Sequence, residues 1–258
     1  MSRTDRRQDK NQNMEKGRKM LEIKDLTKTY GKYKAADGVN LTVADGEIGI
    51  LLGPNGAGKS TVIKSTAGLL RYKGKILING KEARSIDAKK IFAYVPELPA
   101  MYEALTVREH IEFIIHAYHI QTEEEEIGRL FDRFELTDKQ DKLGSELSKG
   151  MMQKVSICCA LIIQPKVILL DEPMVGLDPA AIKELKQVIL ELKEAGVTVL
   201  VSTHMLEMVK ELWDVMFVMD KGHIIASYRK SETKEEDLED LFFHVTESEK
   251  ENEKAKEA

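Results

Sequence analysis

The nine residues from Gly53 to Thr61 constrain the fold of this chain more than any other part of the sequence. They read GPNGAGKST and fit the pattern G-x-x-x-x-G-K-[ST], which is typical of loops that hold phosphate groups. The apolar run Ile48 to Leu52 before them predicts a buried strand, and Thr61 to Ala67 after them predicts a helix. Glycines allow the sharp turn and direct backbone N–H groups inward, where the positive end of the helix also favours an anion. The sequence therefore predicts a strand–loop–helix unit that binds phosphate, and an ordinary glycine-rich turn is the much weaker alternative.

Two side chains in this loop have predicted roles of their own. Lys59 is expected to reach the β and γ phosphates of a nucleoside triphosphate, and the Ser60 hydroxyl is expected to hold Mg²⁺. The loop points to a nucleotide, but it does not say which kind of protein uses that nucleotide. The predicted nucleotide contacts in the loop are Gly53, Pro54, Asn55, Gly56, Ala57, Gly58, Lys59, Ser60 and Thr61.

A second apolar run, Val167 to Leu170, ends in the acidic pair Asp171 and Glu172. Such a run is typical of a buried parallel strand, and ligand sites in open α/β sheets lie at the carboxyl ends of strands. Asp171 is therefore placed to bind Mg²⁺ through water, and Glu172 to orient or deprotonate an attacking water. The alternative is an ordinary strand that ends at a polar turn, which the phosphate loop upstream makes much weaker.

A third pattern precedes the acidic pair, at Leu147 to Gln153. Ser148 is a good residue to cap a helix, and the apolar spacing that follows is helical. A serine and a glycine at the start of a helix can form a second anion site. Because the two anion sites lie far apart in the sequence, the pattern favours two chains that pair across one nucleotide. An ordinary capped helix is the alternative.

Taken in this order, the motifs resemble those of the ATP-binding subunit of an ABC transporter, from about Leu21 to about Glu247. The resemblance implies an α/β fold: a phosphate-loop NTPase core of the RecA-like type, with an antiparallel β subdomain and an inserted helical subdomain. The ATPase domain is then expected over residues 20–247, with the helical subdomain at about 99–150. The composition of residues 1–19 predicts a disordered basic extension, for which contact with anionic lipid is the functional alternative, and 248–258 is a charged tail.

Leu147 to Gln153 resembles the signature motif of this family, which is usually written LSGGQ. Here Lys149 stands at the first glycine and Met151 at the glutamine. The resemblance implies that Ser148, Lys149 and Gly150 bind the ATP that a second subunit holds.

Three more residues take their expected roles from the resemblance alone. Tyr30 resembles the aromatic residue that stacks on adenine. Asp178, in the stretch Gly176 to Pro179, belongs to a segment that resembles the loop contacting the opposite subunit. His204 resembles the switch histidine that contacts the γ-phosphate, so the resemblance implies catalytic roles for Glu172 and His204 together.

Glu97 departs from the family pattern, because the family usually has glutamine at this position. That glutamine touches Mg²⁺ and the attacking water, and it relays the nucleotide state to the membrane subunit. A carboxylate can also ligate Mg²⁺, and it is the stronger ligand as a charged, hard oxygen donor. It also adds negative charge beside Asp171, Glu172 and the phosphates, which weakens ATP binding when no cation lies between them. Glu97 is therefore either a metal ligand together with Ser60 and Asp171, or a side chain that swings away.

The resemblance implies an ATPase subunit that dimerises around two ATP molecules with Mg²⁺ and drives a transmembrane permease from the cytoplasmic face of the cell membrane. Residues 96–106 and 237–246 resemble segments of drug, antibiotic and lipid exporters, which favours export. The runner-up is a soluble ATPase of the same superfamily, in iron–sulfur cluster assembly or DNA repair. A phosphate-loop kinase for small molecules is a third and weaker class.

Composition agrees with one ATPase subunit and excludes other classes. The chain has 258 residues, of which 32% are charged. Its net charge of −5 lacks the excess of positive charge that is typical of proteins that bind nucleic acid. No apolar run reaches the roughly 18 residues that a membrane-spanning helix needs. Its only cysteines, Cys158 and Cys159, are adjacent on a predicted helix and are interpreted as core residues in a reducing cytosol.

Hydrophobic periodicity predicts two sheets and a mainly helical stretch from Leu105 to about Leu147, with Thr106 as a helix cap. The strands predicted for a first, antiparallel sheet are Leu21–Thr27, Gly38–Val43 and Lys75–Asn79. Those predicted for the nucleotide-binding sheet are Ile48–Leu52, Phe92–Val95, Val167–Leu170, Val197–Ser202 and Val215–Met219.

Overall fold

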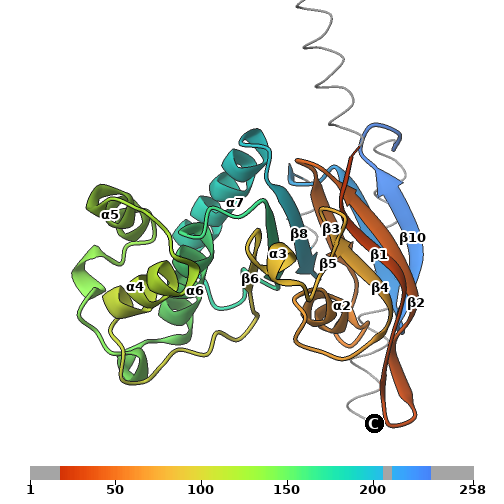
Figure 1. Cartoon of the computed structure of the whole chain (residues 1–258), viewed down its shortest axis with the longest axis horizontal. Helices are drawn as coiled ribbons and strands as arrows, with labels where there is room; N and C mark the ends of the chain where they lie inside the picture. Colours follow the sequence, from red (N-terminus) through yellow and green to blue (C-terminus); the bar gives the residue numbers. More distant parts are fainter. Residues whose placement is uncertain (1–17, 206–210, 234–258) are drawn as a thin grey trace, which may run out of the picture.

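The computed structural model describes residues 18–205 and 211–233, which form two β-sheets with helices packed against them (Figure 1). The first sheet has the strand order β2-β1-β4-β5, and the second has the order β10-β9-β3-β8-β7-β6. The strands are β1 (Lys19–Tyr30), β2 (Tyr33–Ala44), β3 (Ile48–Leu52), β4 (Lys73–Ile78), β5 (Lys81–Glu82), β6 (Phe92–Val95), β7 (Val167–Asp171), β8 (Thr198–Thr203), β9 (Val215–Asp220) and β10 (His223–Arg229).

The described helices are unevenly distributed around the second sheet. Figure 1 shows α4 and α5 on the side of the molecule farthest from the first sheet, with α6 and α7 between them and the strands. The helices are α2 (Lys59–Thr66), α3 (Ile86–Lys89), α4 (Val107–Tyr118), α5 (Glu124–Arg133), α6 (Lys149–Leu161) and α7 (Pro179–Glu194), with short 3₁₀ turns at Thr137–Lys139 and Gly144–Glu146.

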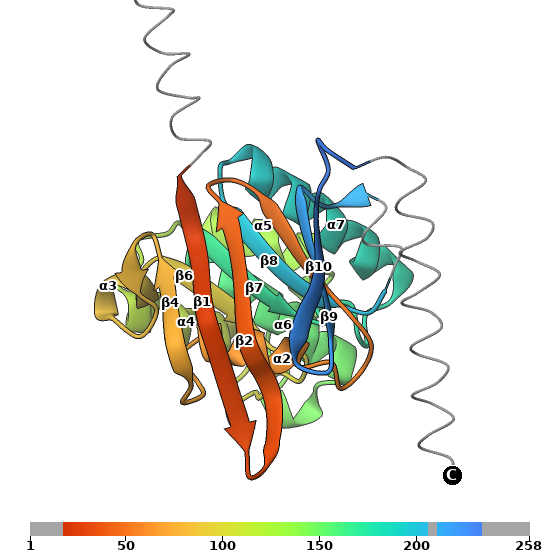
Figure 2. The ribbon, with the colours of Figure 1, turned by 90° about the vertical axis from the view of Figure 1, so that its right-hand side faces the viewer.

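The first sheet is antiparallel throughout, as predicted. Its inward side chains on β1 are Leu21, Ile23 and Leu26, so the alternation slips by one residue between the last two. The slip follows from Asp25, whose backbone is left-handed (φ 49°) where the register with both neighbouring strands shifts. Figure 2 shows the hairpin of β1 and β2 running past the end of the neighbouring strands, with its turn at the lower end of the view.

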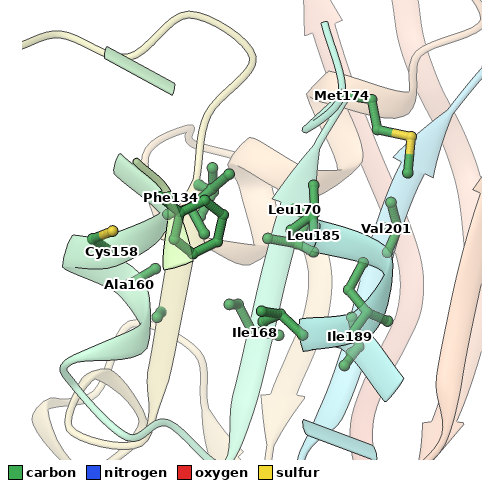
Figure 3. Close-up of a cluster of buried hydrophobic side chains, with 14 of the residues drawn as sticks. Phe134, Cys158, Ala160, Ile168, Leu170, Met174, Leu185, Ile189 and Val201 are labelled. Atoms are coloured by element: carbon green, nitrogen blue, oxygen red, sulfur yellow. The ribbon is translucent and has the colours of Figure 1, made fainter. Parts of the chain in front are cut away.

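The second sheet is buried on both faces at its centre. Every residue of β3 and β7 is buried, because helices cover one face and α2 with the first sheet covers the other. Figure 3 shows one of these cores, where Ile168, Leu170 and Val201 of the sheet meet Leu185 and Ile189 of α7. Strands β6, β7, β8, β3 and β9 are parallel, so the chain segments that follow them gather at one edge.

The helical stretch begins as its sequence predicts. The Thr106 side chain accepts the Glu109 N–H (3.1 Å) while the Glu109 carboxylate accepts the Thr106 N–H (2.7 Å), which is a complete capping box for α4. Helix α5 begins at Glu124, within the predicted run of acids, whose charges suit the positive end of a helix. Ile111 of α4 and Phe131 of α5 enter the same core as α6 and α7, which fixes these helices to the second sheet.

Both predicted sheets are confirmed, and the strand limits differ by a few residues. β10, which pairs antiparallel with β9, was not among the predicted strands. β1 begins at Lys19, inside the stretch predicted to be a disordered extension. The rest of that extension, the exporter-like segment at 237–246 and the charged tail lie outside the described residues. Of the helices in residues 18–205 and 211–233, not one has the length and apolar character to cross a bilayer.

Candidate functional site

The phosphate loop closes tightly against two neighbouring strands, and this contact explains its glycines. A Cβ atom on Gly53 would lie 2.1 Å from the Met219 carbonyl oxygen, and one on Gly58 would lie 2.1 Å from the Ala35 carbonyl oxygen. Gly58 also has a left-handed backbone (φ 107°) at the N-cap of α2. The loop is thus held in one shape from which the first N–H groups of α2, which have no acceptor within the helix, face outward.

Lys59 is buried at the centre of this loop. Its Nζ donates to the carbonyl oxygens of Gly53 (2.7 Å) and Pro54 (3.2 Å) and forms an ion pair with Glu172 Oε1 at 3.1 Å. Both charged side chains are about 5% exposed, so the pair is shielded from water. A positive charge fixed at the N-terminus of a helix is suited to bind the terminal phosphates of a nucleotide.

Asp171 joins the acidic strand end to the phosphate loop. Its Oδ1 accepts hydrogen bonds from the hydroxyls of Ser60 (2.9 Å) and Ser202 (2.6 Å). Its Oδ2 is buried and has no hydrogen-bond partner among the described residues. A buried, unpaired carboxylate oxygen beside a serine hydroxyl fits a hard cation such as Mg²⁺, whose ligands are oxygens. Ser60 and Asp171 therefore have the chemistry of Mg²⁺ ligands, and their role at a metal site stays a prediction.

Glu172 follows Asp171 in a strained conformation that aims its side chain at the loop. Its backbone is left-handed (φ 46°), which is uncommon for a residue with a long side chain. Its N–H donates to the Ser202 carbonyl oxygen at 3.1 Å, and its Oε2 accepts a hydrogen bond from His204 Nδ1 at 3.0 Å. The turn after β7 is thus fastened to the end of β8, and Glu172 is held between Lys59 and His204.

Lys59, Glu172 and His204 border one open cavity of about 610 Å³, and Asp171 lies behind its wall at Ser60. This cavity is the candidate nucleotide site, because Tyr30 of the first sheet lines one part of it while Glu97, Glu172 and His204 line another. From the phosphate loop the lining residues are Asn55, Gly56, Gly58, Lys59, Ser60 and Thr61. Gly53 and Pro54 act beneath them through their carbonyl oxygens, and Ala57 is buried.

Glu97 brings a third carboxylate to this edge of the sheet. It lines the cavity together with Ser60, and it is the second residue after the end of β6. The Tyr94 hydroxyl is buried without a partner among the described residues, and burial, reinforced by the charges of Asp171 and Glu97, raises the pKa of Tyr94 above its usual range. Among the described residues, however, no three His, Cys, Asp or Glu side chains are grouped so as to hold a metal ion, so any cation here would be held by fewer carboxylates together with other oxygens.

The predicted second anion site is well formed but lies elsewhere. Ser148 Oγ accepts the Met151 N–H (3.3 Å) at the start of α6, and both Ser148 and Lys149 are exposed. Gly150 is needed here, because a Cβ atom on it would lie 2.6 Å from the Gly176 carbonyl oxygen. None of these signature residues lines the chain's own cavity as the described residues form it.

Asp178 is engaged within its own chain. It caps α7 by accepting the Ala181 N–H (2.9 Å), and its other oxygen pairs with Lys154 Nζ of α6 at 2.9 Å. The Ala181 N–H, followed by Lys154, holds the pKa of Asp178 below its ordinary value. Asp178 does not border the cavity either, so its predicted contact with nucleotide would have to be made from another subunit.

Sequence reasoning missed two residues of the site. Ser202, at the end of β8, donates through Oγ to Asp171 and accepts the Glu172 N–H. Its neighbour Thr203 accepts the Met205 N–H through Oγ1. Tyr33 lines the cavity beside Tyr30, and its hydroxyl donates to the Gly56 carbonyl oxygen at 3.4 Å. Two features of the sequence could have indicated these residues. Ser202 carries a hydroxyl at the end of a parallel strand, and Tyr33 is a second aromatic residue that follows Tyr30 after a two-residue turn.

Comparison with known proteins agrees with this geometry. A family model described as ABC transporter matches residues 36–175. The ABC-type transporter ATP-binding protein EcsA of Bacillus subtilis is 36% identical, over 88% of this chain and 96% of that protein. The lantibiotic transport ATP-binding protein SrtF of Streptococcus pyogenes is 35% identical, over 86% of this chain and 96% of that protein.

Solved structures give the same result. An ATP-binding subunit of an ABC transporter superposes with a TM-score of 0.77 at 34% identity, covering 87% of this chain and 99% of that one. A dimeric ATP-binding cassette in a post-hydrolysis state, bound to ADP and phosphate, has a TM-score of 0.74 at 26% identity, with 81% and 98% covered. The predicted phosphate-loop α/β fold is thereby confirmed, and the chain belongs to the ABC transporter family as an ATP-binding protein.

Proposed function

We propose that this chain hydrolyses ATP and uses the energy to drive a membrane permease. The observation that carries the proposal is the position of Glu172, which lies on the cavity between Lys59 (3.1 Å) and His204 (3.0 Å). A carboxylate held between a phosphate-binding lysine and a histidine is placed to act on the water that attacks the γ-phosphate.

The chain's residues divide this work among them. Lys59 and the N-terminus of α2 bind the phosphates, and Glu172 orients the attacking water and accepts its proton. His204 holds the Glu172 carboxylate through Nδ1 and faces the same cavity, where it would contact the γ-phosphate. Ser60, Asp171 and Glu97 would hold Mg²⁺, which neutralises the charge of the phosphate oxygens.

We further propose that two subunits pair head to tail, so that Ser148, Lys149 and Gly150 of one face the ATP of the other. The exposed, capped end of α6 supports this arrangement, since it has no phosphate loop of its own chain beside it. ATP would then close the dimer and hydrolysis would reopen it. Asp178 would act at the same interface, next to the helix that its ion pair with Lys154 fixes.

The helical region offers a surface for the permease. A groove of about 550 Å³ lies beside α4, and Tyr102, Phe113 and Tyr118 line it with side chains that are 40–57% exposed. Exposed aromatic side chains around a groove are typical of surfaces that bind another protein. The subunit would then work at the cytoplasmic face of the cell membrane, within an ATPase domain of residues 20–247 whose helical subdomain spans about 99–150.

We propose that the direction of transport is export, because residues 96–106 resemble a segment of drug, antibiotic and lipid exporters. SrtF is named for lantibiotic transport, and a probable multidrug ABC transporter ATP-binding protein of Escherichia coli, YbhF, is 34% identical over 87% of this chain. The names of these relatives point to transport rather than to cluster assembly or DNA repair. We therefore propose an exporter subunit as the finer assignment.

Replacing Glu172 by glutamine tests the proposed chemistry. Glu172→Gln should keep ATP binding, lower turnover by roughly 10²–10⁴-fold and trap an ATP-bound dimer, because it removes the base and leaves the phosphate contacts in place. Phosphate release and size-exclusion chromatography measure these effects. Glu125→Gln, at an exposed carboxylate on α5, is the matched control and should behave as wild type. Near wild-type turnover in Glu172→Gln would remove Glu172 from the mechanism.

A further inference from the structure

The turn between β1 and β2 is flanked by two tyrosines at directly opposite positions of the two strands. Tyr30 and Tyr33 are directly paired across the strands, and the two-residue turn between them contains Gly31 with a left-handed backbone (φ 59°). Directly opposite residues of a hairpin project to the same side of the ribbon, with Cβ atoms about 5 Å apart. Both rings line the nucleotide cavity, so the hairpin presents a pair of aromatic surfaces to it.

Neither ring is buried by packing against the rest of the described protein. Tyr30 is 48% exposed and Tyr33 is 57% exposed, which is unusual for two neighbouring large side chains with no core to cover. The Lys28 ammonium lies over the Tyr30 ring, 4.7 Å from its centroid, so one face of that ring is already covered by a cation. Only the other face of the Tyr30 ring is therefore free to stack on a flat ligand such as a nucleobase.

The Tyr33 ring is tied to the phosphate loop. Its hydroxyl reaches the carbonyl oxygen of Gly56 (3.4 Å), the residue at the outermost part of the loop. The ring therefore spans the gap between the hairpin that carries Tyr30 and the loop that binds phosphate. A nucleotide whose phosphates lie on Lys59 and whose base lies on Tyr30 would have to pass along Tyr33.

We propose that Tyr33 is a second nucleotide-binding aromatic residue, which forms with Tyr30 a two-ring platform for the base of ATP. The assignment rests on the proposed function, since it places ATP in this cavity. Stacking explains why the ring stays exposed at the cavity wall, because every nucleobase has a flat face that an aromatic ring can cover. The contact with Gly56 keeps the platform at a fixed position relative to the phosphates.

Binding of Mg-ATP to three variants separates the ring from the hydroxyl. Tyr33→Ala should weaken ATP binding about tenfold, the scale of one base–aromatic contact. Tyr33→Leu, which keeps an apolar side chain but has no aromatic face, should also bind several-fold more weakly. Tyr33→Phe should stay within about twofold of wild type, because it keeps the ring. Calorimetric titration measures all three, and Ile225→Ala, at an exposed apolar side chain outside the cavity, is the control.

A fluorescent probe tests the contact directly. The chain has one tryptophan, Trp213, which is buried, so Tyr33→Trp introduces an exposed indole at the proposed platform. Mg-ATP should quench this new emission by stacking, whereas Mg-tripolyphosphate, which has no base, should not. If the fluorescence of this tryptophan did not change on addition of Mg-ATP under conditions where calorimetry shows binding, the proposal would be overturned.

The outcomes also separate this inference from the proposed function. Wild-type affinity in both Tyr33→Ala and Tyr33→Leu would overturn the platform and leave the ATP site intact. Equal losses in Tyr33→Phe and Tyr33→Ala would assign the effect to the Gly56 contact and overturn the platform as well. If wild type failed to bind Mg-ATP, or if Lys59→Ala bound it equally well, the proposed function itself would fail.

Discussion

The chain has two helix N-termini that its sequence marks for anions, and the structure builds them differently. At the start of α2, Lys59 is buried and bonded to the loop carbonyls, and Asp171 and Glu172 close the site from the end of β7. At the start of α6, Ser148 and Lys149 are exposed, and the one side-chain hydrogen bond that Ser148 makes with the described residues caps its helix. We call the first the completed half of the proposed shared site, because internal contacts complete it. The second is the exposed half, which we propose a second subunit completes.

The exposed half is nevertheless rigid. Gly150 fits closely against the Gly176 carbonyl oxygen, and the Lys154–Asp178 ion pair ties α6 to the start of α7. The Lys154 side chain is nearly buried, whereas that of Asp178 is about half exposed, so solvent still screens this ion pair in part. A helix end that is fixed but unpaired is preorganised for a partner, because binding then costs little additional ordering. The difference between the halves predicts that mutations in the completed half weaken ATP binding, whereas mutations in the exposed half leave ATP binding intact and reduce ATP hydrolysis.

Lys59→Ala should give the largest loss, because it removes the buried charge from the completed half. Each hydrogen bond to a charged group contributes about 1.5–3 kcal/mol, so losing the phosphate contacts should weaken ATP binding about 100-fold. Dimerisation and hydrolysis should fail as a consequence. Titration with a fluorescent ATP analogue measures the affinity, and Lys64→Ala, on the same helix but away from the cavity, is the control. An unchanged affinity would count heavily against this site.

Ser148→Arg should leave ATP binding within a few-fold of wild type and abolish hydrolysis, because it blocks only the half that serves the other subunit. ATP binding by the isolated chain and phosphate release by the dimer measure the two effects separately. Full hydrolysis by Ser148→Arg would show that the end of α6 does not touch nucleotide.

Mixing the two mutants gives a stronger test of the shared site. In a heterodimer of Lys59→Ala and Ser148→Arg chains, one site carries both lesions and the other carries neither. Activity should therefore return on mixing, to no more than about a quarter of wild type if chains pair at random and each site works alone. Mixing each mutant with itself is the control and should restore nothing.

The completed half could be predicted from the sequence more fully than the exposed half. Glycines that need special backbone angles and acids that follow apolar strands are local features, and Gly53, Lys59 and Asp171 lie where their motifs place them. Ser202 escaped prediction, because its bond to Asp171 depends on β7 and β8 lying side by side, which is a long-range pairing. Asp178 shows the same limit, since its partner Lys154 comes from a different helix.

The same reasoning explains the differences in the fold. The core strands β3, β7 and β8 are continuous apolar runs and were predicted within one or two residues. β10 alternates exposed and half-buried residues along its whole length, so its sequence lacks the apolar run of a buried strand. Its pairing with β9 rather than its own composition makes it a strand. Tyr33 was missed for a related reason, because only the cross-strand pairing shows that it stands beside Tyr30.

Glu97 lies where the completed half meets solvent, and its substitution should have the smallest effect. It lines the cavity with Ser60, and its charge acts together with that of Asp171 on the buried Tyr94 hydroxyl. If Glu97 faces Mg²⁺, Glu97→Gln should keep most of the activity but need a few-fold more Mg²⁺, because a neutral oxygen is the weaker ligand. Glu97→Ala should be worse than Glu97→Gln, since it leaves no oxygen at all.

Titration of ATPase activity with Mg²⁺ at fixed ATP distinguishes the possibilities for Glu97. Glu103→Gln, at an exposed carboxylate a few residues along the chain, is the control for a general change in charge. A shift in Glu97→Gln that Glu103→Gln does not share would place the carboxylate on the metal rather than merely near it. Identical titrations for wild type, Glu97→Gln and Glu97→Ala would make Glu97 a bystander, and the completed half would then hold its cation through Ser60 and Asp171 alone. The buried Oδ2 of Asp171, which has no hydrogen-bond partner among the described residues, would still be open to a cation.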